Sequence, residues 1–217
     1  MGMVCKPTGE KKPDTWEQYE DVLRGTSYCM GVDTAQGSDD PDRAQDANAA
    51  YIFRLPSVER GENPEWPVCV AALHSTDLTE TFAWLTLYAA VYYNSALICP
   101  ETRGEDGTAY LVEIRDYPFI FRMTVTNQKT RKITENIGFD TNARTRTPLF
   151  NKLRKFINSH EDATGIPHLP LVIEMAKIIW LNGRPDHPQG GTSDCVVAWS
   201  LGLWVWGLHK TGRARRA

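Results

Sequence analysis

The sequence has little of three features that would assign it to a common class: long apolar runs, paired cysteines and excess positive charge. No apolar run approaches the roughly 20 residues of a transmembrane helix, and residues 1–14 are too polar for a signal peptide. The five cysteines show no C-x-x-C pair and no zinc-type spacing, which favours free thiols in a reducing compartment. A net charge of -3 does not indicate nucleic-acid binding by itself, although catalytic acids can offset a basic patch.

Two kinds of motif are absent as well. No G-x-x-x-x-G-K-[ST] segment occurs, so the chain lacks the phosphate-binding loop of P-loop NTPases. No two histidines have the H-x-H or H-x-x-x-H spacing of a metal site, and we expect His74, His160 and His168 to be ordinary surface or loop residues. The exception to follow is His187, because its loop leads to Asp194.

The chain has the length and composition of one globular domain. It contains 217 residues, of which 41% are hydrophobic and 24% are charged. We expect a linker or N-terminal tail over 1–25, a folded domain over 26–210 and a basic C-terminal tail over 211–217. The linker-like start suggests that the sequence is part of a longer protein.

The apolar pattern predicts an α/β fold with a central mixed sheet flanked by helices. The first three predicted strands have non-helical connections, so we expect them to be antiparallel. The segment 169–180 is compatible with either a strand or a helix. The resulting order of elements is that of an RNase H-like fold. We expect strands over 28–32, 47–55, 68–74, 96–99 and 119–125, and helices over 77–94, 106–116, 148–159 and 192–210.

Two of the predicted helices have further features. The first begins at Asp77 as N-cap, and Glu80 three residues later completes a capping-box pattern. The last helix has Thr192 or Ser193 as its cap and is apolar on most faces. Such a helix is expected to pack against a missing domain or against another copy of the chain.

Three carboxylates stand at the ends of predicted elements. Asp33 ends the first strand, Glu101 follows the fourth strand, and Asp194 opens the last helix. In an RNase H-like sheet the first and fourth strands are neighbours, so Asp33 and Glu101 should meet, with Asp194 approaching from the helix N-terminus. Three such acids suit two Mg²⁺ or Mn²⁺ ions about 3.5–4 Å apart. Taken singly, the acids have plainer interpretations as a turn former, a surface residue and a first-turn helix acid.

Basic residues gather in a polar segment after the predicted strand at 119–125. They could neutralise phosphates without recognising a base sequence, or they could simply keep a hairpin or loop in water. Arg103, just past Glu101, could meet a scissile phosphate or pair with Asp106. The basic residues of this candidate DNA-binding set are Lys129, Arg131, Lys132, Arg144 and Arg146.

Four segments resemble motifs of the C-terminal nuclease domain of tailed-bacteriophage terminase large subunits. Tyr28–Gly37 is similar to the first nuclease motif, Asp46–Tyr51 to a second strand that often carries an acid, and Pro100–Gly107 to the second acidic motif. Gly190–Ala198 is similar to the third motif. Many members carry His-Asp-Asp in that motif, whereas this chain has Thr-Ser-Asp, so Ser193 replaces the first acid of the pair.

The resemblance implies a metal-dependent endodeoxyribonuclease that cuts concatemeric viral DNA during genome packaging. It implies that Asp33 ligates both metal ions, that Glu101 and Asp194 each complete one shell, and that Asp46 is an accessory ligand. Mg²⁺ or Mn²⁺, as two ions, would be the cofactor. Ser193 in place of an acid predicts weaker occupancy by two metals or a preference for Mn²⁺.

The resemblance also implies partners and a location. Double-stranded DNA would be the substrate, cut with little sequence preference. The terminase ATPase domain, the small terminase subunit and the portal would be protein partners, with no role for a membrane. The protein would act in the cytoplasm of an infected bacterium.

Two other functions fit the same pattern. A different RNase H-like nuclease, of the resolvase or transposase type, would share the acids but prefer branched DNA or specific ends. A non-catalytic DNA-binding packaging module would keep the fold without activity, and Ser193 is the feature that favours it.

Overall fold

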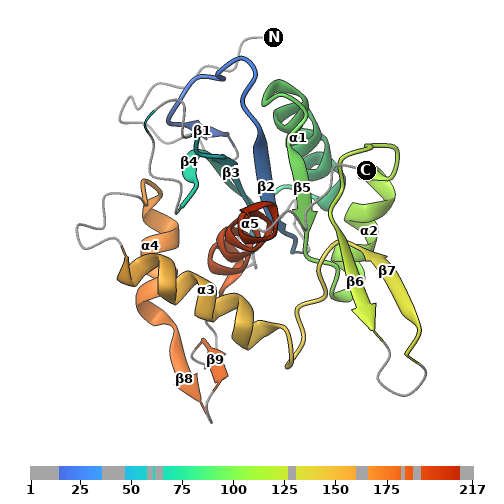
Figure 1. Cartoon of the computed structure of the whole chain (residues 1–217), viewed down its shortest axis with the longest axis vertical. Helices are drawn as coiled ribbons and strands as arrows, with labels where there is room; N and C mark the ends of the chain where they lie inside the picture. The colour runs from blue at the N-terminus through green and yellow to red at the C-terminus, as the bar shows by residue number, and fades with distance from the viewer. Residues whose placement is uncertain are drawn as a thin grey trace.

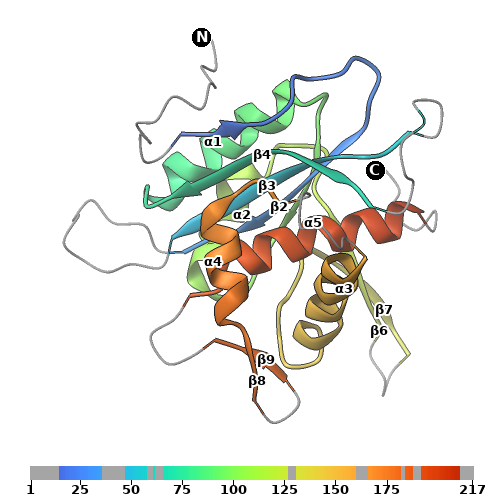
Figure 2. The ribbon, with the colours of Figure 1, turned by 90° about the vertical axis from the view of Figure 1, so that its left-hand side faces the viewer.

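The protein is built on one five-stranded mixed sheet with helices on both faces (Figures 1 and 2). The structure, a computed structural model, describes residues 15–35, 47–57, 61, 66–126, 131–159, 166–181, 184–187 and 192–210. The strands follow the order β1-β4-β3-β2-β5 across the sheet. They are β1 (Glu17–Gln18), β2 (Tyr28–Asp33), β3 (Asn48–Arg54), β4 (Val68–Ser75) and β5 (Leu97–Pro100).

The pairing of the strands confirms the predicted α/β class and the antiparallel start. Strand β3 is antiparallel to both β2 and β4, and β2 and β5 run parallel as neighbours. The two helices α1 (Thr79–Tyr92) and α2 (Gly104–Ile114) cover one face. The other face carries α3 (Arg146–Asn158), α4 (Leu169–Lys177) and α5 (Asp194–Lys210).

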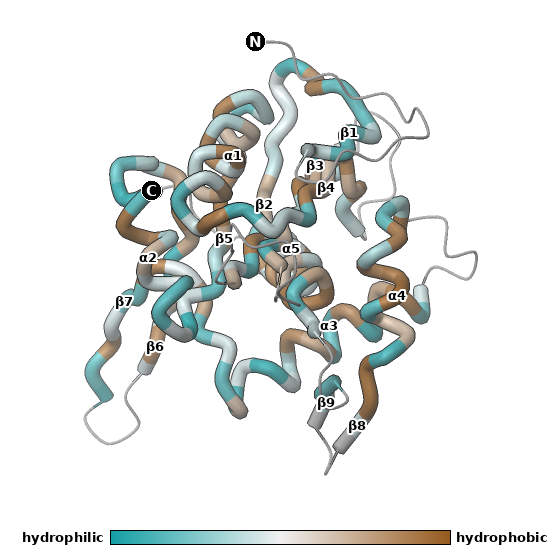
Figure 3. Tube along the Cα trace, turned by 180° about the vertical axis from the view of Figure 1, so that it is seen from behind, coloured by the Kyte–Doolittle hydropathy of each residue, from teal (hydrophilic) through white to brown (hydrophobic). Residues whose placement is uncertain are grey.

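Two ribbons of two strands extend from this body. One is the hairpin of β6 (Arg122–Thr126) and β7 (Ile133–Ile137), which projects beside α2 in Figure 1. The other pairs β8 (Ile179–Leu181) with β9 (Arg184–Asp186) below α3 and α4. Figure 3 shows the hydrophobic stretch that runs from α4 into β8. The segment 169–180, open between strand and helix in the sequence, is therefore both in succession.

Strand β2 separates two hydrophobic cores because its side chains alternate between the faces of the sheet. Tyr28, Met30 and Val32 belong to the core under α1 and α2, whereas Cys29 belongs to the core under α5. Asp33 shares the parity of Cys29 and therefore faces the same side as α5. The strand pattern thus decides which face receives the carboxylate.

Helix α5 lies very close to β2 at Gly31. A Cβ atom on Gly31 would collide with the backbone carbonyl of Ala198 and the backbone nitrogen of Gly202. The thiol of Cys29 contacts the carbonyl oxygen of Gly202 at 3.7 Å. Since later residues of α5 lie beside earlier residues of β2, the two elements run in opposite directions. The N-terminus of α5 therefore lies at the Asp33 end of β2.

Two expectations about the helices are wrong. Helix α1 begins at Thr79 with no side-chain cap, because Asp77 instead accepts a hydrogen bond from the Ser75 hydroxyl at 2.8 Å. Helix α5 does not leave its apolar faces to a missing domain or another copy, since the sheet, α3 and α4 cover them. An exposed apolar face lies on α1, where Tyr88 and Val91 are 69% and 62% exposed.

The described part of the predicted N-terminal tail lies against the sheet. Glu17 and Gln18 pair with Ala72 and Ala71 of β4. Trp16 is buried, and its indole N–H donates to the carbonyl oxygen of Leu85 at 3.3 Å. Among the described residues, no helix has the length and hydropathy to cross a membrane.

Candidate active site

Asp33 and Glu101 stand opposite each other on adjacent parallel strands. The pairing of β2 with β5 aligns Val32 with Pro100, so the next residues on the two strands are these acids. The backbone N–H of Glu101 donates to the carbonyl oxygen of Val32 at 2.8 Å, which continues the ladder to this point. The two carboxyl groups are within hydrogen-bond reach of each other. The sheet register, rather than sequence proximity, brings them together.

Asp194 reaches the same region from the N-terminus of α5. Its Oδ2 accepts a hydrogen bond from the backbone N–H of Ala47 at 3.2 Å, just before β3. Its charge is also close enough to act on Asp33. The structure therefore brings together all three of the acids singled out in the sequence.

The ionised form of Asp33 is strongly disfavoured in this group. It is only 5% exposed. Burial raises the pKa of its carboxyl well above the usual range, and the negative charges of Glu101, Asp194 and Glu174 raise it further. A buried group of like charges is stabilised by a bound cation, and carboxylate oxygens are ligands that suit Mg²⁺ and Mn²⁺. The residues present thus fit a divalent metal.

Glu174 is a fourth acid of this neighbourhood that sequence reasoning did not single out. It lies on α4 and is 7% exposed. Its Oε1 accepts a hydrogen bond from the Thr192 hydroxyl, and its Oε2 accepts one from the backbone N–H of Val196, both at 3.1 Å. The carboxylate of another helix thus caps α5, where Thr192 or Ser193 was the predicted cap. The only signal was a lone acid within the apolar segment 169–180.

Two histidines lie near these acids, and one of them is buried. His168 is 2% exposed, and its Nδ1 lies 2.7 Å from the hydroxyl of Tyr51. His74, at the end of β4, is half-buried, and its ring centroid lies 6.2 Å from that of His168. His187 follows β9, and His160 lies outside the described residues. His168 therefore lies in a loop directly before α4, which is within the expectation of surface or loop residues, but it is buried there.

Part of the basic set lies on the β6–β7 hairpin. Arg131 and Lys132 are exposed just before β7, whereas Lys129 lies outside the described residues, as does the acid Asp46. The base of the hairpin adjoins the acids, because Phe139, shortly after β7, forms a bridge with Glu101. The hairpin thus extends into solvent from the β5 edge of the acidic group (Figure 1).

The other basic residues surround the path from β7 to α3. Arg103 donates to the carbonyl oxygen of Thr141 at 3.0 Å, and Arg144 is exposed. Arg146 is held within the protein. Its Nε donates to the Pro185 carbonyl oxygen at 3.2 Å, and its guanidinium carbon lies 4.9 Å from the centre of the Phe150 ring.

Ser193 occupies the position at which the terminase resemblance would expect an acid. Its hydroxyl oxygen lies 3.3 Å from Nη2 of Arg146, which donates a hydrogen bond to it. A positive group therefore stands beside this position. Residue 193 itself therefore carries no acid, but Glu174 supplies a further negative charge close to Asp33.

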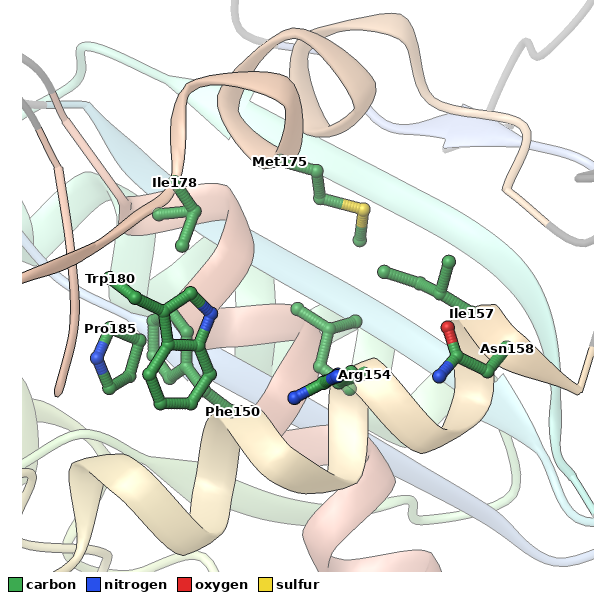
Figure 4. A pocket seen from close by; sticks show the side chains of 9 residues that line it. Phe150, Arg154, Ile157, Asn158, Met175, Ile178, Trp180 and Pro185 are labelled. Atoms are coloured by element: carbon green, nitrogen blue, oxygen red, sulfur yellow. The ribbon is translucent and has the colours of Figure 1, made fainter. Parts of the chain in front are cut away.

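A shallow apolar pocket lies elsewhere, between α3, α4 and the β8–β9 ribbon (Figure 4). No acid lines it, and its one charged side chain is Arg154. Trp180, on its rim, is 46% exposed. This pocket offers no group for hydrolytic chemistry, so the acidic group is the candidate active site.

Comparisons with known proteins bear on this arrangement. No protein-family model and no curated protein matches the chain. The solved structure of the large terminase nuclease from thermophilic phage G20c with bound magnesium matches with a TM-score of 0.61 at 12% identity, covering 93% of this chain and 92% of that chain. The same nuclease with bound cobalt matches with a TM-score of 0.60 at 12% identity, covering 93% and 92%.

A third match is the same nuclease with bound zinc, with a TM-score of 0.57 at 12% identity over 93% of this chain and 94% of that chain. At such low identity these matches show a shared fold. The resemblance found in the sequence is therefore confirmed at the level of the fold, over nearly the whole chain.

Proposed function

We propose that this chain is a metal-dependent DNA endonuclease domain of the terminase type, which cuts concatemeric viral DNA during genome packaging. The observation that carries the proposal is the convergence of Asp33, Glu101 and Asp194 at one end of the sheet, in a fold shared with a terminase nuclease. Buried carboxylates that lie close together are stabilised when they bind divalent cations.

In this proposal Asp33 is the shared ligand of two Mg²⁺ or Mn²⁺ ions, and Glu101 and Asp194 each hold one of them. Such ions activate a water for attack on the phosphorus and stabilise the leaving oxygen. The chain's own residues set the geometry: β2 and β5 hold two acids at fixed register, and α5 presents the third. Cleavage would leave a 3′-hydroxyl and a 5′-phosphate. Asp46 stays a proposed accessory ligand.

The site's DNA contacts are assigned to the basic residues at its edge. Arg131 and Lys132 are exposed on the hairpin that adjoins Glu101, and Arg144 is exposed nearby. They would neutralise phosphates without reading bases, which agrees with little sequence preference. Arg103, Lys129 and Arg146 complete this proposed set, and Nη2 of Arg146 also donates a hydrogen bond to the Ser193 hydroxyl.

Cleavage of supercoiled plasmid tests the nuclease. We expect nicking and linearisation in Mn²⁺ or Mg²⁺, no cleavage in EDTA, and a loss of about a hundredfold in rate for Asp33→Asn, since even groups that only support a metal ligand contribute roughly 10–100-fold. Asp116→Asn is the matched control, because this acid is exposed at the end of α2, away from the site. Equal cleavage by Asp33→Asn and the unaltered chain would refute the site. A strong preference for four-way junctions would favour a resolvase.

Salt-dependent binding tests the hairpin. The double variant Arg131→Ala/Lys132→Ala, studied in EDTA, should bind duplex DNA more weakly on every sequence. Its plot of log affinity against log salt should be shallower by about 1–2. Arg115→Ala, an exposed arginine after α2, should leave the slope unchanged. An unchanged slope for the double variant would remove the hairpin from the DNA interface.

A non-catalytic packaging module is the second candidate, because Ser193 and Arg146 place a hydroxyl and a cation beside the acids. Calorimetry separates the two candidates. DNA binding without any uptake of Mn²⁺ would favour the module, whereas Mn²⁺ uptake that Asp33→Asn abolishes would favour the nuclease.

A further inference from the structure

A second group of ligand atoms lies behind the acids, and its chemistry differs from theirs. The donor atoms of His74, Glu174 and Cys195 all lie within 4.8 Å of one another. They come from three elements, the end of β4, helix α4 and the start of α5, and they offer one nitrogen, one oxygen and one sulfur atom. Among the described residues, this is the one group of at least three histidine, cysteine or acidic side chains whose ligand atoms all lie that close together.

The sheet register explains how this group forms beside the acids. Asp33 pairs with Ala49, and Ala49 pairs with His74, so these residues lie in one row across β2, β3 and β4. Directly paired residues point to the same face. That face is the one covered by α5, where Cys195 follows Asp194. Strands about 4.8 Å apart put His74 about 10 Å from Asp33 along the row.

The protein already holds two of these groups in place. Glu174 accepts hydrogen bonds from Thr192 and Val196, one on each oxygen, and a carboxylate has further lone pairs free for a metal. The hydroxyl of Tyr51 contacts the Cys195 thiol and is itself held by His168. Such outer hydrogen bonds are typical of metal ligands, whose orientation they fix.

We propose that His74, Glu174 and Cys195 form a second metal site, which binds a borderline-soft cation such as Zn²⁺ and is separate from the nuclease acids. Bonds of about 2.0–2.3 Å place neighbouring zinc donors about 3.3–3.8 Å apart, so a small contraction of the present group closes the site. Water completes the four-coordinate shell. Mg²⁺ is disfavoured here because it prefers oxygen donors throughout.

The ion would tie the sheet to the start of the last helix. It joins β4 and α4 to α5 at Cys195, one residue after Asp194. Binding to the folded chain alone stabilises that chain by mass action. The site therefore fixes the helix end that carries a nuclease acid, and its existence does not depend on nuclease activity.

Cobalt titration of the purified chain tests the proposal, since a thiolate bound to Co²⁺ gives an intense near-ultraviolet charge-transfer band. We expect this band to saturate near one ion per chain and to disappear when Zn²⁺ is added. Cys195→Ser should abolish it. Cys69→Ser, a buried cysteine of β4, and Cys5→Ser are the matched controls and should keep it.

Two more variants keep the test decisive. His74→Ala, at a half-buried position, should weaken Co²⁺ binding about tenfold or more. If Cys195→Ser fails to fold, the Co²⁺ affinity of His74→Ala decides the test. Asp33→Asn should lose plasmid cleavage yet retain the band, which separates this site from the nuclease proposal. No band in the unaltered chain, a band that survives Cys195→Ser, or unchanged affinity in His74→Ala would overturn the second site.

Discussion

At the scale of single residues, burial sets the chemistry of the charged groups more than their place in the sequence does. Asp33 is nearly fully buried beside three other acids, so its pKa is raised mainly by loss of water and then by like charge. Lys152 on α3 shows the converse. Burial and, to a smaller extent, the charge of Lys155 lower its pKa from 10.5 to about 8.

Lys152 gives a test through the pH dependence of stability. Its Nζ donates to the Trp204 carbonyl oxygen at 3.3 Å. Because its pKa is lowered on folding, the unfolded chain binds more protons between pH 8 and pH 10.5, so this residue adds stability as pH rises through that window. Lys152→Met removes this effect. In thermal unfolding, the Tm of the unaltered chain minus that of the variant should be larger at pH 10.5 than at pH 7.

The control for this experiment is Lys177→Met, at an exposed position near the end of α4. It should follow the pH dependence of the unaltered chain. If Lys152→Met also follows it, the ammonium group of Lys152 has the same proton affinity in the folded and unfolded chain, and burial does not lower its pKa.

At the scale of elements, the contact of α5 with β2 positions the acids. Gly31 lets the strand approach the backbone of the helix at Ala198 and Gly202 so closely that no side chain fits between them. The N-terminus of α5 is then held by Glu174, through Val196, and presents Asp194 toward Asp33. The site is therefore only as rigid as this helix-on-strand contact.

Gly31→Ala tests this contact. The added methyl group meets backbone atoms of Ala198 and Gly202, which cannot turn away as a side chain could. We expect a loss of about 1–3 kcal/mol in the free energy of unfolding. We also expect plasmid cleavage to fall by more than the loss of folded protein, since Asp194 moves with α5.

Gly207→Ala provides the matched control on the same helix. There the added methyl group meets the end of the Lys152 side chain, which can turn away at the cost of its hydrogen bond to the Trp204 carbonyl, so the backbone of the helix keeps its place. Alanine is also favoured over glycine within a helix by about 1 kcal/mol. This gain offsets the lost hydrogen bond of Lys152, so stability should change little, and cleavage should be unchanged. Equal effects of the two substitutions would show that α5 does not depend on the close approach at Gly31.

At the scale of the whole molecule, the acids lower the free energy of unfolding when no cation is bound, because folding brings like charges close together. The net charge of -3 is modest, so this cost comes from local crowding around Asp33 rather than from the overall charge. A cation that binds the folded chain relieves it. Metal binding and global stability should therefore be linked.

Metal removal tests this linkage. With Mn²⁺ at about ten times its Kd, mass action adds about 1.4 kcal/mol, or about 3–6 °C in Tm, relative to EDTA. Asp33→Asn should lose most of this gain, and in EDTA it should be at least as stable as the unaltered chain, because one buried charge is gone. Differential scanning calorimetry measures both. An Mn²⁺ gain that Asp33→Asn retains would place the ion elsewhere.

The sequence by itself determined four of the five strands of the sheet, all but β1, and the three acids that stand at element ends. Alternating apolar residues and glycine placed Asp33 after a buried strand, and the order of elements made the strand before Glu101 its neighbour. These signals are local, because they consist of the spacing of apolar residues and the position of glycine. They also located Asp194 at the start of the last helix, where polar residues give way to an apolar run.

Only the tertiary structure decided what surrounds those acids. Glu174, His74 and Cys195 are far apart along the chain, and each has an ordinary interpretation in its own segment. They meet because α4 packs against α5 and because the strand register aligns His74 with Ala49 and Asp33. The capping of α5 by Glu174 instead of its own neighbours has the same origin. Contacts between distant segments depend on register and helix packing, which local sequence patterns do not encode.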